Sequence, residues 1–335
     1  MVQEKDCLAE ERLLHNVLST LAIPLGRLER SDYRSEKTLF GKVMVLVEGY
    51  VQELLQNKSL GNPSLEGESK KIFVIAPNLA LVALKPTMYS FTFNRYGIVE
   101  GTDSIRLQFW RLFAQFLNEF VSETLLGRRA SLYAAEICAL VNDNILDLAY
   151  PFVSNYLGGF TKDNVRYAII RYAAALPPIE VVWKNYFVGT MKHALKKVDQ
   201  YNLRQGCVLG YESKLPQDIV RFDWRNPLPD KDECIPSDFA DFYIDTKNAV
   251  RVARLTSYLL GDFLKKGGYE LVDLCYFMNK EGNSVYSEIT PDGMRIKKKE
   301  CSYDKDLWRA GKDAAVITAT WKNLYADLEV AYAKD

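Results

Sequence analysis

Short β-type runs occur in closely spaced pairs, and long helical patterns separate the pairs along the chain. Lys71–Ile75 is followed at once by Leu79–Leu84, and Leu271–Phe277 is joined to Ser284–Ile289 by the turn residues Asn279–Asn283. Runs joined by such short turns pair as antiparallel hairpins. The pattern therefore predicts an α+β fold with antiparallel sheets and excludes a doubly wound parallel sheet.

Apolar residues with helical spacing predict the remaining elements. The predicted helices cover residues 6–21, 39–56, 103–125, 130–150, 163–175, 238–266 and 306–332. Two further strands are expected at Glu180–Trp183 and Ile219–Trp224.

Charge and cysteine content exclude several classes of protein. The 335 residues carry 43 basic and 43 acidic side chains, so no net field attracts nucleic acid or an anionic membrane. No apolar stretch is long enough for a membrane span, and the first residues lack the pattern of a signal peptide. Six scattered cysteines without a CxxC pair indicate reduced thiols, so we expect a cytoplasmic protein.

Several catalytic chemistries require residues or motifs that this sequence lacks. With only two histidines, His15 and His193, a histidine-rich metal site is impossible. The chain has neither a GxxxxGK[ST] nor a GxGxxG phosphate loop, so a bound nucleotide would need another scaffold.

The densest group of chemically useful residues is Ser287-Glu-Ile-Thr-Pro-Asp-Gly-Met-Arg295, and Leu271-Val-Asp273 begins sixteen residues before it. This pair resembles the SAICAR synthetase (phosphoribosylaminoimidazole-succinocarboxamide synthase) family, in which an LVDFK-like strand precedes a DE-x-[ST]-P-D-x-x-R motif. Other segments resemble family motifs in the same order: residues 65–73, 101–106, 178–190 and 225–226.

The resemblance covers residues 65–118 and 165–332 and implies a two-part fold around a central cleft. It divides the chain into a helical extension at 1–60, a smaller nucleotide-side part at 61–176 and a larger substrate-side part at 177–335. The smaller part is expected to contain an added helical insertion near 120–162.

The resemblance also implies a reaction. Family enzymes use ATP and Mg²⁺ to phosphorylate a carboxylate, and the amine of aspartate then displaces the phosphate in purine biosynthesis. Carried over by position, the catalytic residues are Glu288, Asp273 and Arg295, with Glu288 also a metal ligand. The substrate-binding residues are Lys184, Asn185, Thr190, Arg225 and Arg106, and the ATP-binding residues are Lys70 and Lys85.

This sequence departs from the family mainly where ATP and the metal would bind. The departures are Glu68, Tyr172, Ala173 and Cys275 at lysine positions, and Phe277 and Ser287 at metal-associated carboxylates. Mg²⁺ prefers oxygen ligands, so the loss of two carboxylates predicts a weakened metal site.

Three hypotheses follow for the function. The first is an ATP-dependent amide ligase acting on a small anionic carboxylate. The second is an enzyme of secondary metabolism that uses the same fold without ATP, for a cyclisation or an addition–elimination, with Glu288, Asp273 and Arg295 as acid, base and anion anchor. The third is a ligand-binding pseudoenzyme. The added helices would serve as packing or as the interface of a homodimer.

Some of the selected residues also have purely structural interpretations. Arg295 could pair with Asp292 or Glu288 across a turn, and Asp273 could cap the end of a strand. Cys275 could be a small buried filler, and Lys184 a solvated neighbour of Trp183.

Overall fold

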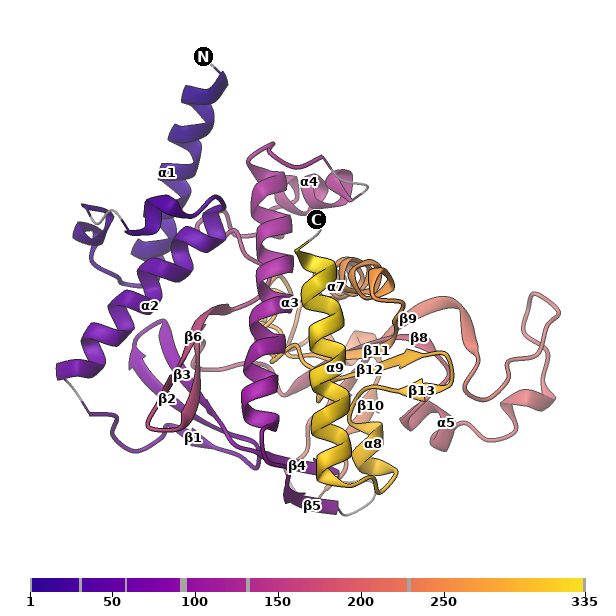
Figure 1. The fold of residues 1–335 in the computed structure, drawn as a ribbon. Coiled ribbons are helices and arrows are strands. Elements are labelled where there is room, and N and C mark those ends of the chain that lie inside the picture. The colour runs from indigo at the N-terminus through magenta and orange to yellow at the C-terminus, as the bar shows by residue number, and fades with distance from the viewer. Residues whose placement is uncertain are drawn as a thin grey trace.

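Helices pack against two antiparallel sheets, which confirms the α+β prediction (Figure 1). The structure is a computed structural model that describes residues 2–29, 32–57, 59–90, 95–130, 133–227 and 230–333. The helices are α1 (Val2–Thr20), α2 (Leu39–Asn57), α3 (Thr102–Leu125), α4 (Ala134–Asn142), α5 (Thr190–Ala194), α6 (Ser237–Ala240), α7 (Thr246–Lys266), α8 (Asp306–Arg309) and α9 (Ala314–Tyr332).

The strands form a five-stranded sheet, a six-stranded sheet and a two-stranded hairpin. The first sheet has the order β1 (Leu65–Glu66), β2 (Lys70–Ala76), β3 (Leu79–Leu84), β7 (Val165–Arg171) and β6 (Tyr156–Lys162). The second has the order β10 (Glu233–Ile235), β9 (Lys214–Trp224), β8 (Ile179–Tyr186), β11 (Glu270–Tyr276), β12 (Met294–Lys298) and β13 (Cys301–Ser302). The hairpin pairs β4 (Thr87–Ser90) with β5 (Arg95–Ile98).

The predicted hairpin of β2 and β3 is present, with Phe73 opposite Leu81. Residues 163–175, by contrast, are not a helix, and this prediction was wrong. Most of the segment is strand β7, which pairs with both β3 and β6. Asp163 and Asn164 both have positive φ, at 50° and 61°, as the two-residue turn of a twisted hairpin requires. Pairing on both edges thus overrides the helical spacing of the apolar residues.

Helix α3 lies between two hydrophobic cores. Its residues Phe109 and Phe113 belong to the core that the second sheet forms with α7 and α9. Trp110 and Ala114 belong instead to the core of the first sheet with α1 and α2. Figure 1 shows α3 running beside α9 through the middle of the molecule.

The second sheet has one apolar and one polar face. Val181 and Trp183 of β8 are buried in the core with α7, and successive side chains of a strand point to opposite faces. Glu180 and Lys184 of the same strand therefore lie on the other face. Polar residues on that face have no helix core to fill, which makes it the candidate site of chemistry.

Other predicted elements are shorter than expected. Residues 130–150 contain only α4, and 306–332 is divided into α8 and α9. The range 238–266 is interrupted before Asp245, whose side chain caps α7 by accepting a hydrogen bond from the Asn248 amide at 2.9 Å. Residues 284–289 form no strand; Val285 makes isolated bridges to Ser154 and Met278.

The N-terminal helices pack against the first sheet, where Val17, Phe40 and Val47 are fully buried. The region near 120–162 is only partly helical, because it ends in β6, a strand of that sheet. The three-part division of the chain and the homodimer stay predictions. No helix in the described residues combines the length and apolar character of a membrane span, and the six cysteines are free thiols.

Gly282, in the turn after β11, is predicted to tolerate no side chain. It has φ of +65°, and an added Cβ would lie 2.5 Å from the backbone oxygen of Asp245. Gly282→Ala should lower the free energy of unfolding by about 2 kcal/mol or more, since both the strain and the backbone contact oppose it. Gly26→Ala is the matched control, because nothing lies within 4 Å of its added Cβ. Equal urea midpoints for the two variants would contradict the prediction.

Candidate functional site

Glu288 is held by a buried arginine from the other half of the molecule. Arg106 Nε donates to Glu288 Oε1 and Arg106 Nη2 donates to Oε2, both at 2.6 Å. Arg106 lies in α3 and is 1% exposed, so the pair is a desolvated, two-pronged ion pair. Helix α3 presents the guanidinium, and the loop between β11 and β12 presents the carboxylate.

Two further groups contact the carboxylate of Glu288. Thr290 Oγ1 donates to Oε1 at 2.9 Å, and Lys70 Nζ lies 3.6 Å from Oε2. Burial alone would raise the pKa of Glu288, but Arg106 outweighs it and the pKa falls to about 2. Lys85 contributes its backbone oxygen, which accepts from Arg106 Nη1 at 3.2 Å.

A second charged cluster lies on the polar face of the second sheet. Strand register places Asp273 of β11 opposite both Lys184 of β8 and Arg295 of β12. Lys184 Nζ and Arg295 Nη1 each donate to Asp273 Oδ2 at 2.6 Å. Burial would raise the pKa of Asp273, but the two cations hold it well below its ordinary value.

The guanidinium of Arg295 also binds a second carboxylate besides that of Asp273. Its Nε donates to Asp306 Oδ2 at 2.9 Å, whereas Asp292 pairs with Lys305 at 3.0 Å. The proposed pairing of Arg295 with Asp292 or Glu288 is therefore wrong. Lys184 is only 2% exposed, so it is also not a solvated neighbour of Trp183.

The other predicted substrate residues lie outside these two clusters. Asn185 follows Lys184 on β8 and is half-buried, and Thr190 is exposed at the first residue of α5. Arg225 is largely exposed just after β9, near Glu180 and Asp232. The structure thus joins Arg106 and Lys70 to Glu288, and Lys184 and Arg295 to Asp273.

Sequence reasoning missed two carboxyl groups on the same face. Register places Glu180 of β8 directly opposite Asp223 of β9, and Asp223 is 5% exposed. The alternation of polar and apolar residues in residues 219–224 was the available signal, since it places Arg221 and Asp223 on one face.

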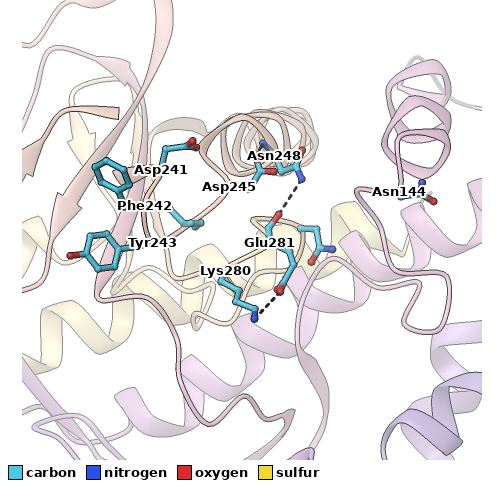
Figure 2. A pocket seen from close by; sticks show the side chains of 10 residues that line it. Asn144, Asp241, Phe242, Tyr243, Asp245, Asn248, Lys280 and Glu281 are labelled. Carbon is cyan, nitrogen blue, oxygen red and sulfur yellow. Dashed lines mark hydrogen bonds and ion pairs between the residues drawn. The ribbon is translucent and has the colours of Figure 1, made fainter. Parts of the chain in front are cut away.

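A hollow among the described residues lies away from both clusters. Figure 2 shows it at the start of α7, with a volume of about 500 Å³. A hydrogen bond joins its two walls: Asn248 Nδ2 donates to the backbone oxygen of Glu281 at 3.2 Å. None of the predicted site residues lines this hollow, so we assign no chemistry to it.

Comparison with known families identifies the family of this chain. The family described as SAICAR synthetase matches residues 65–324. The chain belongs to the SAICAR synthetase family. The match begins after α2.

Two relatives of known name align with different shares of this chain. The chain is 24% identical over 315 residues to the bifunctional cordycepin biosynthesis cluster protein 3 of Cordyceps militaris, which covers 78% of this chain and 32% of that protein. It is 29% identical over 147 residues to the phosphoribosylaminoimidazole-succinocarboxamide synthase of Methanoregula boonei, which covers 42% of this chain and 54% of that protein. The chain therefore spans about a third and about half of their lengths.

Solved SAICAR synthetases share the fold. A type-2 structure in complex with ADP aligns with a TM-score of 0.57 at 21% identity, covering 79% of this chain and 96% of that one. The enzyme from Pyrococcus horikoshii aligns with a TM-score of 0.55 at 21% identity, covering 78% and 97%. These likenesses confirm the two-sheet architecture.

The residues at the family's metal position do not fit a magnesium ion. Both carboxylate oxygens of Glu288 already accept from Arg106, and Phe277 offers no ligand. Ser287 Oγ, at the other lost carboxylate, is buried without a hydrogen-bond partner in the described part of the chain. Within the same ranges, no group of three or more His, Cys, Asp or Glu residues is placed to hold a metal.

The lysines predicted to bind ATP are engaged as well. Lys85 Nζ donates to Glu66 Oε1 at 2.7 Å and to the Gly67 oxygen at 2.8 Å. Lys70 faces Glu288. Both amines therefore face carboxylates of the chain, which a triphosphate would have to displace.

Substitution of Arg106 should lower the free energy of unfolding, because it breaks the ion pair with Glu288. Arg106→Met leaves a buried carboxylate without its partner and should lower the free energy of unfolding by about 3–5 kcal/mol. The double variant Arg106→Met/Glu288→Leu should recover most of this loss, because no buried charge remains. Urea denaturation measures the free energy of unfolding of both variants. A double variant as unstable as the single one would show that the unpaired charge of Glu288 is not the cause of the loss.

Acid should weaken the same interaction. The pKa of Glu288 falls from an ordinary 4.5 to about 2, so its stabilising contribution is complete above pH 4.5 and is lost as the pH falls toward 2. The difference in unfolding free energy between the wild type and Glu288→Gln should narrow over this range. A constant difference would show that the carboxylate titrates normally.

Proposed function

We propose that this chain is an enzyme of secondary metabolism that forms or rearranges a C–N bond of a small anionic substrate without magnesium-ATP. The reaction would be an addition–elimination or a cyclisation. The observation that carries the proposal is the cluster of Lys184, Arg295 and Asp273 on the polar face of the second sheet, where three paired strands bring the two cations to one carboxylate.

The charges of this cluster suit an anionic ligand. Lys184 and Arg295 bring two cations to one oxygen of Asp273. Asp306 balances the Nε edge of Arg295, whose side chain is 21% exposed. Gly189 turns with φ of +64° close to the guanidinium, where an added Cβ would lie 3.0 Å from Arg295 Nη1. A planar guanidinium is well suited to bind a carboxylate or phosphate.

The relatives support the metabolic setting. The name of one relative assigns it to cordycepin biosynthesis, which agrees with secondary metabolism. The family itself contains C–N ligases, so C–N chemistry is the part of the family function that this proposal keeps. The engaged Glu288 and the replaced residues at 275, 277 and 287 support the loss of ATP.

A second candidate is an ATP-dependent amide ligase acting on a carboxylate. Family membership over residues 65–324 favours it, as does the presence of ADP in the complex of the type-2 SAICAR synthetase. It would require Arg106 to release Glu288, and Lys85 to leave Glu66, before nucleotide could bind.

Magnesium-ATP is predicted to leave the melting temperature unchanged. A ligand at about 100 times its dissociation constant adds roughly 2.7 kcal/mol, a shift of several degrees for a chain of this size. We expect equal melting curves with millimolar ATP plus Mg²⁺ and with ATP plus EDTA, because the donor set is already satisfied. A magnesium-dependent shift would instead favour the ligase.

A direct assay separates the two candidates. Incubation with ATP, Mg²⁺, aspartate and carboxyaminoimidazole ribotide should release no ADP above background. ADP release that Glu288→Gln abolishes would overturn the ATP-independent proposal.

A further inference from the structure

A second polar group occupies the sheet face that carries Lys184. The strand register places Glu180 of β8 directly opposite Asp223 of β9. The next residue of β8 on the same face is Val182, which lies between Arg221 of β9 and Cys275 of β11. Directly opposed residues have their Cβ atoms about 5 Å apart. Two carboxyl groups thus face each other at the end of the sheet away from Lys184.

Asp223 has an acceptor atom that nothing in the described residues satisfies. The residue is 5% exposed, and Arg221 contacts its Oδ2. Its Oδ1 is buried without a hydrogen-bond partner in the ranges that the structure describes. A buried carboxylate oxygen without a donor is costly, so Oδ1 is an acceptor that an N–H of a ligand could use.

The chain's own guanidinium stands beside this pair. Arg225 Nη1 lies 3.7 Å from Glu180 Oε1 and 3.3 Å from Asp232 Oδ2, and its side chain is 47% exposed. Its guanidinium carbon is 5.4 Å from the centre of the Phe277 ring. The contact with Glu180 is too long for a hydrogen bond, so a ligand with planar N–H donors can replace it.

We propose that Glu180 and Asp223 bind the nitrogen nucleophile of the reaction, a primary amine or an amidine, and that Glu180 accepts its proton. The inference rests on the proposed C–N chemistry and names its nitrogen substrate. Arg225 occupies the subsite until the nitrogen compound displaces it.

The proton balance of the step is simple. The nitrogen lone pair forms the new C–N bond, and the bond from that carbon to its leaving group breaks with its electron pair. The bound cation first gives one proton to the Glu180 carboxylate, which frees the lone pair for this attack, and the second surplus proton on nitrogen leaves with the departing group. Burial raises the pKa of Glu180 to about 7, with Arg225 opposing the change, so the group can exchange a proton near neutral pH.

The position of the pair agrees with this role. Glu180 precedes Lys184 by four residues on β8, so the two lie roughly 13 Å apart along the strand. Val182 and Cys275 lie between them on the same face. These two uncharged side chains thus separate the electrophile's anchor at Lys184 and Arg295 from the bound nitrogen.

Benzamidine is the probe, because its cationic plane of N–H donors resembles that of Arg225, and neutral benzamide is the matched control ligand. By titration calorimetry we expect benzamidine to bind at least tenfold more tightly than benzamide. Glu180→Gln and Asp223→Asn should each weaken it about tenfold, whereas Glu300→Gln, an exposed carboxylate elsewhere, should leave it unchanged. Arg225→Ala should strengthen binding, since it removes the competing guanidinium.

The pH dependence identifies Glu180 itself. The charged and titratable groups around it are Arg221, Asp223, Arg225, Asp232 and Cys275. Because ionised Glu180 binds the cation, affinity should rise up to about tenfold from pH 6 to pH 8 in the wild type, and should stay flat in Glu180→Gln.

Equal binding of the two ligands, or full binding by Glu180→Gln, overturns the amine subsite. Circular dichroism of each variant confirms that it is folded, and Glu180→Gln remains decisive if Asp223→Asn is not. Neither result depends on ATP, so the subsite can fail while the unchanged response to magnesium-ATP still supports the proposed function.

Discussion

The bidentate ion pair of Arg106 and Glu288 joins groups 182 residues apart and sets the geometry between the two sheets. Arg106 also donates to the backbone oxygen of Lys85, just after β3. One guanidinium therefore ties α3, the first sheet and the loop before β12 together. Because both charges are buried, neither can be removed alone without a large loss. The same pair occupies the oxygens that a metal ion would need, so a stabilising contact also restricts the chemistry.

The second sheet separates stability from chemistry by strand alternation. Val181 and Trp183 fill the core with α7, while Glu180 and Lys184 of the same strand face away from it. Neighbouring strands repeat this division, so charged residues gather in rows on one face. The two ends of this face differ: two cations meet at Asp273, and two carboxyls face each other at Glu180 and Asp223. An enzyme that joins an anionic electrophile to a nitrogen nucleophile needs these two environments side by side.

Local patterns predicted the α+β class, the β2–β3 hairpin and the strand of Asp273, because each depends on neighbouring residues in the sequence. They failed for β7, whose pairing with β3 and β6 is decided by distant residues. Motif resemblance identified Glu288, Asp273 and Arg295, but could not show that Arg106 or Lys184 already binds these carboxylates. Glu180 was missed because its importance arises only from the register that sets it opposite Asp223, a relation between strands that no single motif contains.

Helix α3 has a further consequence for how the chain can be divided. Phe109 and Phe113 contribute to one core, and Trp110 and Ala114, their immediate neighbours in the sequence, contribute to the other. A fragment that ended near residue 176 would leave half of this helix with bare aromatic surface in water. The two parts suggested by the family pattern thus both pack against α3, which contributes to each core. Replacing either half would therefore require a new partner for the face of α3 that this half covers.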